Sequence, residues 1–246
     1  MIAPQTIDRR SRPAFQFHAL VGLPCGCVAA AYRSSMKYNI SGNIDFANPT
    51  VTLPPGTPPA LAGTIALLSA GVNSKALYNR GLTSDVKLPQ MANFSFLWQM
   101  NPQWQIMGDV QYTGWSSIPQ LKFVPTDGSA LPAVTLNWKN TYKYAGGASY
   151  RYNDPWKWRF GVAFDQTPAN STDTTVRLPD SDRWWLTTGF EYKWSPNIKI
   201  DTGFAYIFAD SPSFNQNQGS TAGNGLVKGS YDASVWILSL QGTYTF

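Results

Sequence analysis

Residues able to carry acid–base or nucleophilic chemistry are few in this sequence. His18 is the only histidine, and it precedes the strand-rich part of the chain, where no Ser-His or Asp-His pair can therefore form. Asp180 and Asp182 are a carboxylate pair beside Arg183, which we interpret as a salt bridge that tethers a loop. Cys25 and Cys27 are too close in sequence for an ordinary disulfide and too few for a zinc site. We expect no enzymatic activity, no metal site and no cofactor.

Binding of an anionic group is a chemistry that the other charged residues allow. Apart from Arg9, Arg10 and Arg12, they are spread singly along the chain. Because a nucleic-acid binder gathers its positive charges in a patch, this spread argues against nucleic-acid binding despite a formal net charge of +5. Arg183 and Asp165 are the most informative of them, because a guanidinium matches the two oxygens of a carboxylate. These two side chains either pair with each other or hold the polar head of an amphipathic ligand.

Within the segments that carry these charges, the character of the residues alternates with a period of two. Large apolar residues alternate with small or charged ones in WKWRFGVAFD (156–165), RWWLTTGFEYKW (183–194) and IKIDTGFAYIF (198–208). This period is typical of strands with one apolar and one polar face. About eight strands are predicted, near residues 30–46, 85–100, 103–116, 137–153, 156–167, 182–195, 198–210 and 227–246. Their polar faces carry Arg33, Lys37, Asp109, Lys143, Arg151, Lys157, Arg159, Asp165, Arg183, Glu191, Lys193 and Asp201.

The breaks between these strands alternate in length. Short breaks hold NPQ (101–103), NDP (153–155) and SPN (195–197), each typical of a tight turn. Long breaks, rich in Pro, Ser, Thr, Asn and Gly, fall at about 47–84, 117–136, 168–181 and 211–226. Alternating long and short connections are typical of an outer-membrane up-and-down β-barrel. The sequence therefore predicts an all-β, transmembrane antiparallel barrel.

Composition agrees with a membrane barrel. Aromatic residues make up 14% of the 246 residues, while Glu191 is the only glutamate, and no apolar run reaches the roughly 20 residues that a membrane helix needs. The alternative, a soluble β-sandwich, would have to bury many Trp and Tyr side chains with few partners for their N–H and O–H groups. The apolar faces are thus expected to meet lipid.

Three stretches resemble the long-chain fatty acid outer-membrane transporter family, the FadL family, which also includes transporters of aromatic hydrocarbons. They are NPQWQIMGDVQYTGWSSIPQLKF (101–123), WRFGVAFDQTP (158–168) and LPDSDRWWLTTGFEY (178–192), and the resemblance runs in order from about residue 31 to Phe246. It implies that the chain supplies about the last eight strands of a fourteen-stranded barrel. The family's N-terminal hatch has no counterpart in this sequence.

Residues 1–28 resemble nothing in this family, so we divide the chain into residues 1–28 and a partial barrel over residues 29–246. Two interpretations of the first segment stay open. It is either sequence read in another frame or an export signal, because Arg9, Arg10 and Arg12 precede a weakly apolar stretch that ends in small residues.

The resemblance implies a path for a hydrophobic ligand. It favours a head-group role for Arg183 and Asp165, although a wall-stiffening salt bridge stays an alternative. Apolar residues on the polar faces would line a hydrophobic pathway: Trp185, Trp115, Met107 and Ile207. A helix is predicted within residues 53–81, amphipathic because Leu61, Ile65, Leu68 and Val72 share one face. These four residues would capture acyl chains at the outer loops, or instead pack on neighbouring loops.

We therefore expect transport of long-chain fatty acids or similar hydrophobic compounds by binding and diffusion, in the outer membrane of a Gram-negative bacterium. The expected partners are the hydrophobic ligand, outer-membrane lipid and the barrel-assembly machinery, for which a C-terminal aromatic residue such as Phe246 is a suitable signal. Two alternatives are a general diffusion porin and a structural or adhesive barrel.

Overall fold

Antiparallel β-strands make up most of the computed structural model, which describes residues 15–44, 53, 55–75, 79–131, 133–170, 179–217 and 225–246. The chain divides into two compact units. The larger comprises residues 12–36, 87–120 and 135–246, and the smaller comprises residues 1–11, 37–86 and 121–134. The candidate site lies wholly in the larger unit.

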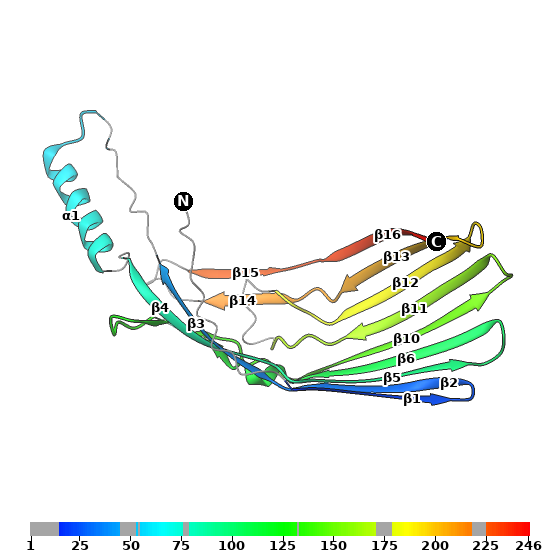
Figure 1. Ribbon diagram of the computed structural model, residues 1–246. Helices are drawn as coiled ribbons and strands as arrows, with labels where there is room; N and C mark the ends of the chain where they lie inside the picture. Colours follow the sequence, from blue (N-terminus) through cyan, green and yellow to red (C-terminus); the bar gives the residue numbers. More distant parts are fainter. Residues whose placement is uncertain are drawn as a thin grey trace. The chain divides into compact units, whose positions relative to one another are not determined.

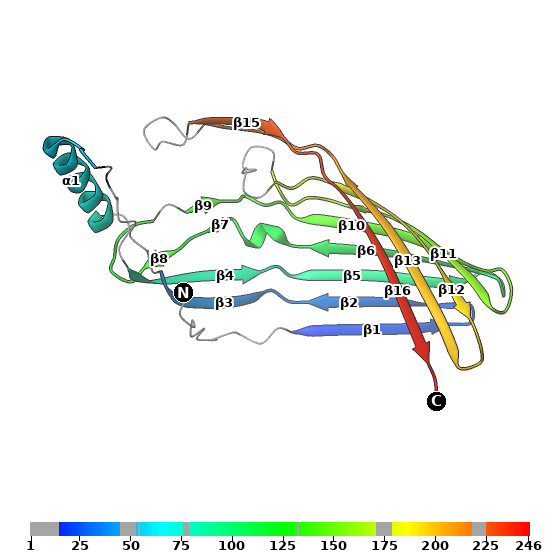
Figure 2. The ribbon, with the colours of Figure 1, turned by 90° about the horizontal axis from the view of Figure 1, so that it is seen from above.

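A nine-stranded sheet forms the larger unit, in the order β1-β2-β5-β6-β10-β11-β12-β13-β16 (Figure 1). Every pairing in it is antiparallel, and β2 lies beside β5 although a long connection separates them in the sequence (Figure 2). The strand bounds are β1 (Gln16–Leu23), β2 (Gly26–Arg33), β5 (Met91–Gln99), β6 (Trp104–Thr113), β10 (Thr141–Arg151), β11 (Trp156–Asp165), β12 (Arg183–Lys193), β13 (Ile198–Ala209) and β16 (Ser234–Tyr244).

The two faces of this sheet differ as the two-residue period predicts. One face, here called the outer face, carries large apolar side chains that are exposed, among them Phe160, Leu186 and Phe204. The other, the inner face, carries the predicted charges of the sheet together with many Gly and Ala residues. Among the described residues, only Ile118 and Leu136 are buried hydrophobic side chains. The apolar faces are thus not packed against each other, which argues against the β-sandwich.

The predicted short turns are present, and a side chain fixes each of them. Asn101 Oδ1 accepts hydrogen bonds from the backbone N–H groups of Gln103 and Trp104, at 2.9 and 2.8 Å. Asn153 Oδ1 does the same for Trp156 N–H at 3.0 Å, and Ser195 Oγ for Ile198 N–H at 3.1 Å. Turns that are closed by their own polar residue explain why these breaks are short.

The smaller unit holds the one described α-helix, α1 (Pro59–Lys75), and most of two strands, β3 (Met36–Ile44) and β4 (Arg80–Leu88). A third strand, β8 (Val124–Pro125), pairs with β4. Taking the two units together, the remaining described elements of the chain are η1 (Trp115–Ser117), β7 (Gln120–Leu121), β9 (Val134–Thr135) and the hairpin of β14 (Ser213–Asn217) and β15 (Leu226–Ser230). No helix among the described residues is long and apolar enough to cross a membrane.

Several predicted strands are interrupted. The segment 30–46 contains β2 and β3, and 85–100 contains the end of β4 and all of β5, separated by Pro89 and Gln90. Proline lacks the N–H that a ladder hydrogen bond needs, so a break there is expected. At the other end of the chain, 227–246 splits into β15 and β16.

The hairpin of β1 and β2 was not predicted. Residues 16–23 fall in the segment that the sequence placed outside the barrel, yet β1 pairs with β2 along its whole length. The proposed boundary at residue 28 lies inside β2.

Candidate functional site

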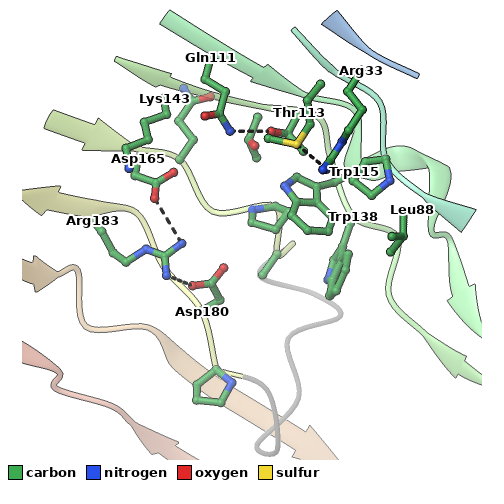
Figure 3. A pocket seen from close by; sticks show the side chains of 17 residues that line it. Arg33, Leu88, Gln111, Thr113, Trp115, Trp138, Lys143, Asp165, Asp180 and Arg183 are labelled. Atoms are coloured by element: carbon green, nitrogen blue, oxygen red, sulfur yellow. Dashed lines mark hydrogen bonds and ion pairs between the residues drawn. The ribbon is translucent and has the colours of Figure 1, made fainter. Parts of the chain in front are cut away.

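Two cavities on the inner face of the larger unit are lined by residues predicted for the site. The first, the loop-end cavity, has a volume of about 590 Å³ and lies where strands meet the long connections. Figure 3 shows its side chains, which come from β2, the last residue of β4, β5, β6, η1, β10, β11 and β12 and from adjoining loops. Its charged residues are Arg33, Lys143, Asp165, Asp180 and Arg183. With three cations against two carboxylates, the cavity carries one excess positive charge.

Arg183 shares its charge between two carboxylates. It lies directly opposite Asp165 in the register of β11 and β12. Its Nη2 is 3.7 Å from Asp165 Oδ2, and its Nη1 is 3.6 Å from Asp180 Oδ1 (Figure 3). These distances are those of ion pairs rather than of short hydrogen bonds. The cation predicted to hold a head group is therefore already largely neutralised.

Arg33 and Lys143 are the cations without a carboxylate partner among the described residues. Arg33 Nη2 donates to the sulfur of Met91 at 2.9 Å, and its Nε is buried with no hydrogen-bond partner in the described part of the chain. Lys143 Nζ lies 4.6 Å from the ring centroid of Trp185. Neither contact balances a full positive charge, so these two groups supply the unmatched charge of the cavity.

An apolar wall stands beside these cations. The rings of Trp115 and Trp138 meet edge to face, with centroids 5.4 Å apart and planes at 88°. Both line the loop-end cavity together with Leu88 (Figure 3). Asn140 Oδ1 accepts from Ser116 N–H at 3.0 Å, which fixes the short helix that carries Trp115. A cavity with unmatched cations and an aromatic wall suits an amphipathic anion.

The tether predicted around Asp180 and Asp182 is present. Asp182 Oδ1 accepts from Thr167 N–H and Asp180 Oδ2 from Thr167 Oγ1, both at 2.7 Å. These bonds hold the segment after β11 against the segment before β12, and Asp180 also pairs with Arg183. The carboxylate pair thus anchors the rim of the loop-end cavity.

The second cavity, the mid-sheet cavity, has a volume of about 750 Å³ and lies over the middle of the same face. Met107, Trp185 and Leu97 contribute apolar surface, and Lys143 and Arg159 are among its charged residues. Its floor consists of small residues: Ala29, Ala145, Gly147, Gly161, Ala163, Gly189 and Gly203. At Gly189 an added Cβ would lie 2.3 Å from the backbone oxygen of Thr202, so only glycine allows the strands to approach this closely.

An ion-pair network borders the mid-sheet cavity toward the short turns. Arg159 Nη1 lies 2.7 Å from Asp201 Oδ1, and Arg159 Nη2 lies 2.5 Å from Glu191 Oε2. Lys199 Nζ is near both carboxylates, at 3.9 and 4.0 Å. The guanidinium reaches from β11 to β12 and β13, which ties three strands together. This arrangement corresponds to the wall-stiffening role that the sequence left open for the inner charges.

The predicted pathway residues are divided between the two cavities. Trp115 lines the loop-end cavity, while Met107 and Trp185 line the mid-sheet cavity. Ile207 lines neither, although it is the register partner of Trp185 on the neighbouring strand. Strand phase placed Arg33 and Lys143 on the polar face but assigned them to no site.

The predicted helix is present as α1, but its amphipathic character is not. Leu61 and Leu68 are 52% and 64% exposed and Ile65 is partly exposed, while the side chain of Val72 lies outside the described residues. Leu67, which is off this stripe, is 77% exposed. Small and apolar residues occur all around the helix, so no polar face opposes the predicted stripe.

The sequence of the chain matches one family of known proteins. The family described as Outer membrane protein transport protein (OMPP1/FadL/TodX) matches residues 26–246. The chain belongs to this family. The FadL family consists of outer-membrane transport proteins rather than enzymes, which agrees with the expectation that the chain is not an enzyme.

Curated relatives of the chain carry names of the same kind. The Long-chain fatty acid transport protein of Escherichia coli (strain K12) is 28% identical over 224 residues, covering 89% of this chain and 44% of that protein. Outer membrane protein P1 of Haemophilus influenzae is 30% identical over 177 residues, covering 72% and 35%. The chain spans about half the length, or less, of the curated relatives it matches.

Solved structures agree on the fold. A Pseudomonas aeruginosa FadL homologue has a TM-score of 0.74 at 22% identity, covering 94% of this chain and 52% of that chain. The Pseudomonas putida toluene transporter TodX has a TM-score of 0.51 at 13% identity, covering 91% and 46%. The predicted all-β, outer-membrane barrel class is thereby confirmed, although the nine-stranded sheet described here is open at β1 and β16.

Proposed function

We propose that the chain takes part in the passage of long-chain fatty acids or similar hydrophobic compounds across the outer membrane of a Gram-negative bacterium. The observation that carries this proposal is the loop-end cavity, where Arg33 and Lys143 lack carboxylate partners among the described residues beside the Trp115–Trp138 wall. The cations suit a carboxylate head, and the wall suits the first carbons of an acyl chain.

Movement would follow from binding and diffusion along the inner face. The mid-sheet cavity shares the lining residue Lys143 with the loop-end cavity and has an apolar, small-residue floor over which an acyl chain can slide. Neither step needs a nucleotide or a metal, and no group of metal-ligating residues occurs in the described part of the chain. The relatives' names support the same substrate class.

We propose different roles for the charged residues of the loop-end cavity. Arg183 and Asp165 shape the rim of the site, while Lys143 and Arg33 make the direct contact with the carboxylate. For the outer loops we retain Leu61, Ile65, Leu68 and Val72 of α1 as the capture surface, and for the outside of the sheet we propose contact with outer-membrane lipid. Insertion would depend on the barrel-assembly machinery.

Equilibrium dialysis tests the proposal against a general porin. The chain is refolded into lipid vesicles, and uptake of radiolabelled dodecanoate is compared with that of empty vesicles. We expect saturable binding above lipid partitioning, together with no swelling of the vesicles in arabinose. Binding equal to that of empty vesicles would contradict the proposal, and rapid arabinose entry would favour the porin.

A further inference from the structure

Lys143 lines both the loop-end cavity and the mid-sheet cavity. It is the only charged residue of the described chain that lines the loop-end cavity and the mid-sheet cavity alike. In the sheet it lies directly between Gln111 on β6 and Asp165 on β11. A movement of its side chain therefore changes the lining of both cavities.

The ammonium group lies over an aromatic ring instead of beside a carboxylate. Lys143 Nζ is 4.6 Å from the ring centroid of Trp185, and no ion pair joins Lys143 to Asp165 within the described residues. Asp165 is the register neighbour of Lys143, but it pairs with Arg183 at 3.7 Å. A cation–π contact is weaker than a charge-assisted hydrogen bond, so a carboxylate that enters the loop-end cavity can compete for the ammonium group.

Trp185 is left with an unmet donor in this arrangement. Its Nε1 is buried and has no hydrogen-bond partner among the described residues. Its ring lines the mid-sheet cavity, and Ala163 and Ile207 are its neighbours in register. A buried N–H without an acceptor is costly, which leaves this side chain ready to adopt another environment.

We propose that Lys143 and Trp185 form a junction between the two cavities that a carboxylate opens. A head group in the loop-end cavity draws the ammonium group away from Trp185, and the part of the indole that the ammonium group covered is then added to the apolar lining of the mid-sheet cavity. A ligand can shift such an equilibrium only through different affinities for the two states. A carboxylate has that difference because it pairs with Lys143 only in the displaced state, whereas an uncharged alcohol lacks it. This inference rests on the proposed function and makes the pair a determinant of specificity.

Fluorine NMR of the whole chain in lipid vesicles tests the junction. Tryptophan is replaced by 5-fluorotryptophan, and the resonance of residue 185 is assigned by its loss in Trp185→Phe. We expect dodecanoate to move this resonance and 1-dodecanol, of equal chain length, to leave it unchanged. In Lys143→Met the resonance should lie near its dodecanoate-bound position without ligand, and Lys143→Arg should retain the response.

Dodecanoate binding, measured by dialysis on the same samples, separates this inference from the proposed function. If dodecanoate binds saturably but does not shift the Trp185 resonance, the proposed junction is overturned and the proposed function is retained. An equal shift with 1-dodecanol would overturn it as well. Absence of saturable dodecanoate binding would overturn both. Because the comparison of the two ligands uses the parent chain, it decides the question even where Lys143→Met fails to fold.

Discussion

Asp165 and Arg183 face each other in register across β11 and β12, and Arg183 Nη2 lies 3.7 Å from Asp165 Oδ2. Asp180 approaches the other terminal nitrogen of the same guanidinium at 3.6 Å. Of the two alternatives that the sequence allowed for this pair, the ion pair is present and lies in the wall of the loop-end cavity, while the head-group role stays a prediction. The carboxylates of Asp165 and Asp180 neutralise Arg183, and their negative charges also repel an anionic ligand.

Removing one of these carboxylates should strengthen anion binding. Asp165→Asn raises the net charge of the loop-end cavity by one, and we predict about three- to tenfold tighter binding of dodecanoate, with 1-dodecanol unchanged. Asp154→Asn makes the same chemical change in a short turn, outside both cavities, and should have no effect. Weaker dodecanoate binding by Asp165→Asn would mean that the carboxylate positions Arg183 for the ligand.

A charge on the outer face of the sheet should be expensive. Phe204 is on the outer face of β13 and 41% exposed, and Phe204→Arg should lower the free energy of unfolding by roughly 2–4 kcal/mol where the residue lies near the bilayer midplane. Ala205→Lys, one residue along on the inner face, should cost much less. Urea titrations of both variants in lipid vesicles measure the difference. Equal costs would show that the assignment of the two faces is wrong.

The network around Arg159 should contribute modestly to stability. Asp201→Asn removes the ionic partner that lies 2.7 Å from Arg159 Nη1. Because the arginine side chain is 41% exposed, solvent screens the pair, and we predict a loss of about 1 kcal/mol in the free energy of unfolding. Lys193→Gln, which removes a lysine with no ion pair among the described residues, should leave the urea midpoint unchanged. A midpoint that is equal for both variants would remove the stabilising role from the network.

The capture role of α1 depends on one stripe of the helix. Leu68→Asp should weaken the binding of a fluorescent fatty acid while gel migration of the folded chain stays unchanged. Leu67→Asp introduces the same charge at another exposed position, off the stripe, and is the matched control. Because the helix is apolar on several sides, equal losses in both variants would favour general contact with the helix over a specific stripe.

The strands and tight turns of the sheet could be predicted from local pattern alone. The two-residue period gives the phase of each strand, and Asn101, Asn153 and Ser195 are residues that close turns with their own side chains. The hairpin of β1 and β2 could not, because the inner positions of β1 are mixed in character and residues 1–28 lack the family's pattern. The position of the helix in the sequence was predicted correctly, but its amphipathic character was not. The spacing of apolar residues on one face does not show which residues occupy the other faces.

The site could be predicted only in part, for reasons of distance along the chain. Strand phase placed Arg33 and Lys143 on the inner face, but their surroundings depend on pairings between distant segments. Arg33 meets Met91 only because β2 pairs with β5, and Lys143 meets Trp185 only because β10, β11 and β12 are adjacent. Which arginine or lysine is left without a carboxylate follows from these contacts and not from residue type.

The most direct test of the account is the affinity of the chain for dodecanoate and 1-dodecanol when an unmatched cation of the loop-end cavity is removed. Arg33→Met keeps a flexible, unbranched side chain, though a shorter one, and abolishes its charge. Loss of a charge-assisted hydrogen bond should weaken dodecanoate binding by about tenfold or more, with 1-dodecanol binding altered by less than about twofold. Equal losses for the two ligands, measured by equilibrium dialysis in vesicles, would contradict the claim that this cavity binds a carboxylate head group.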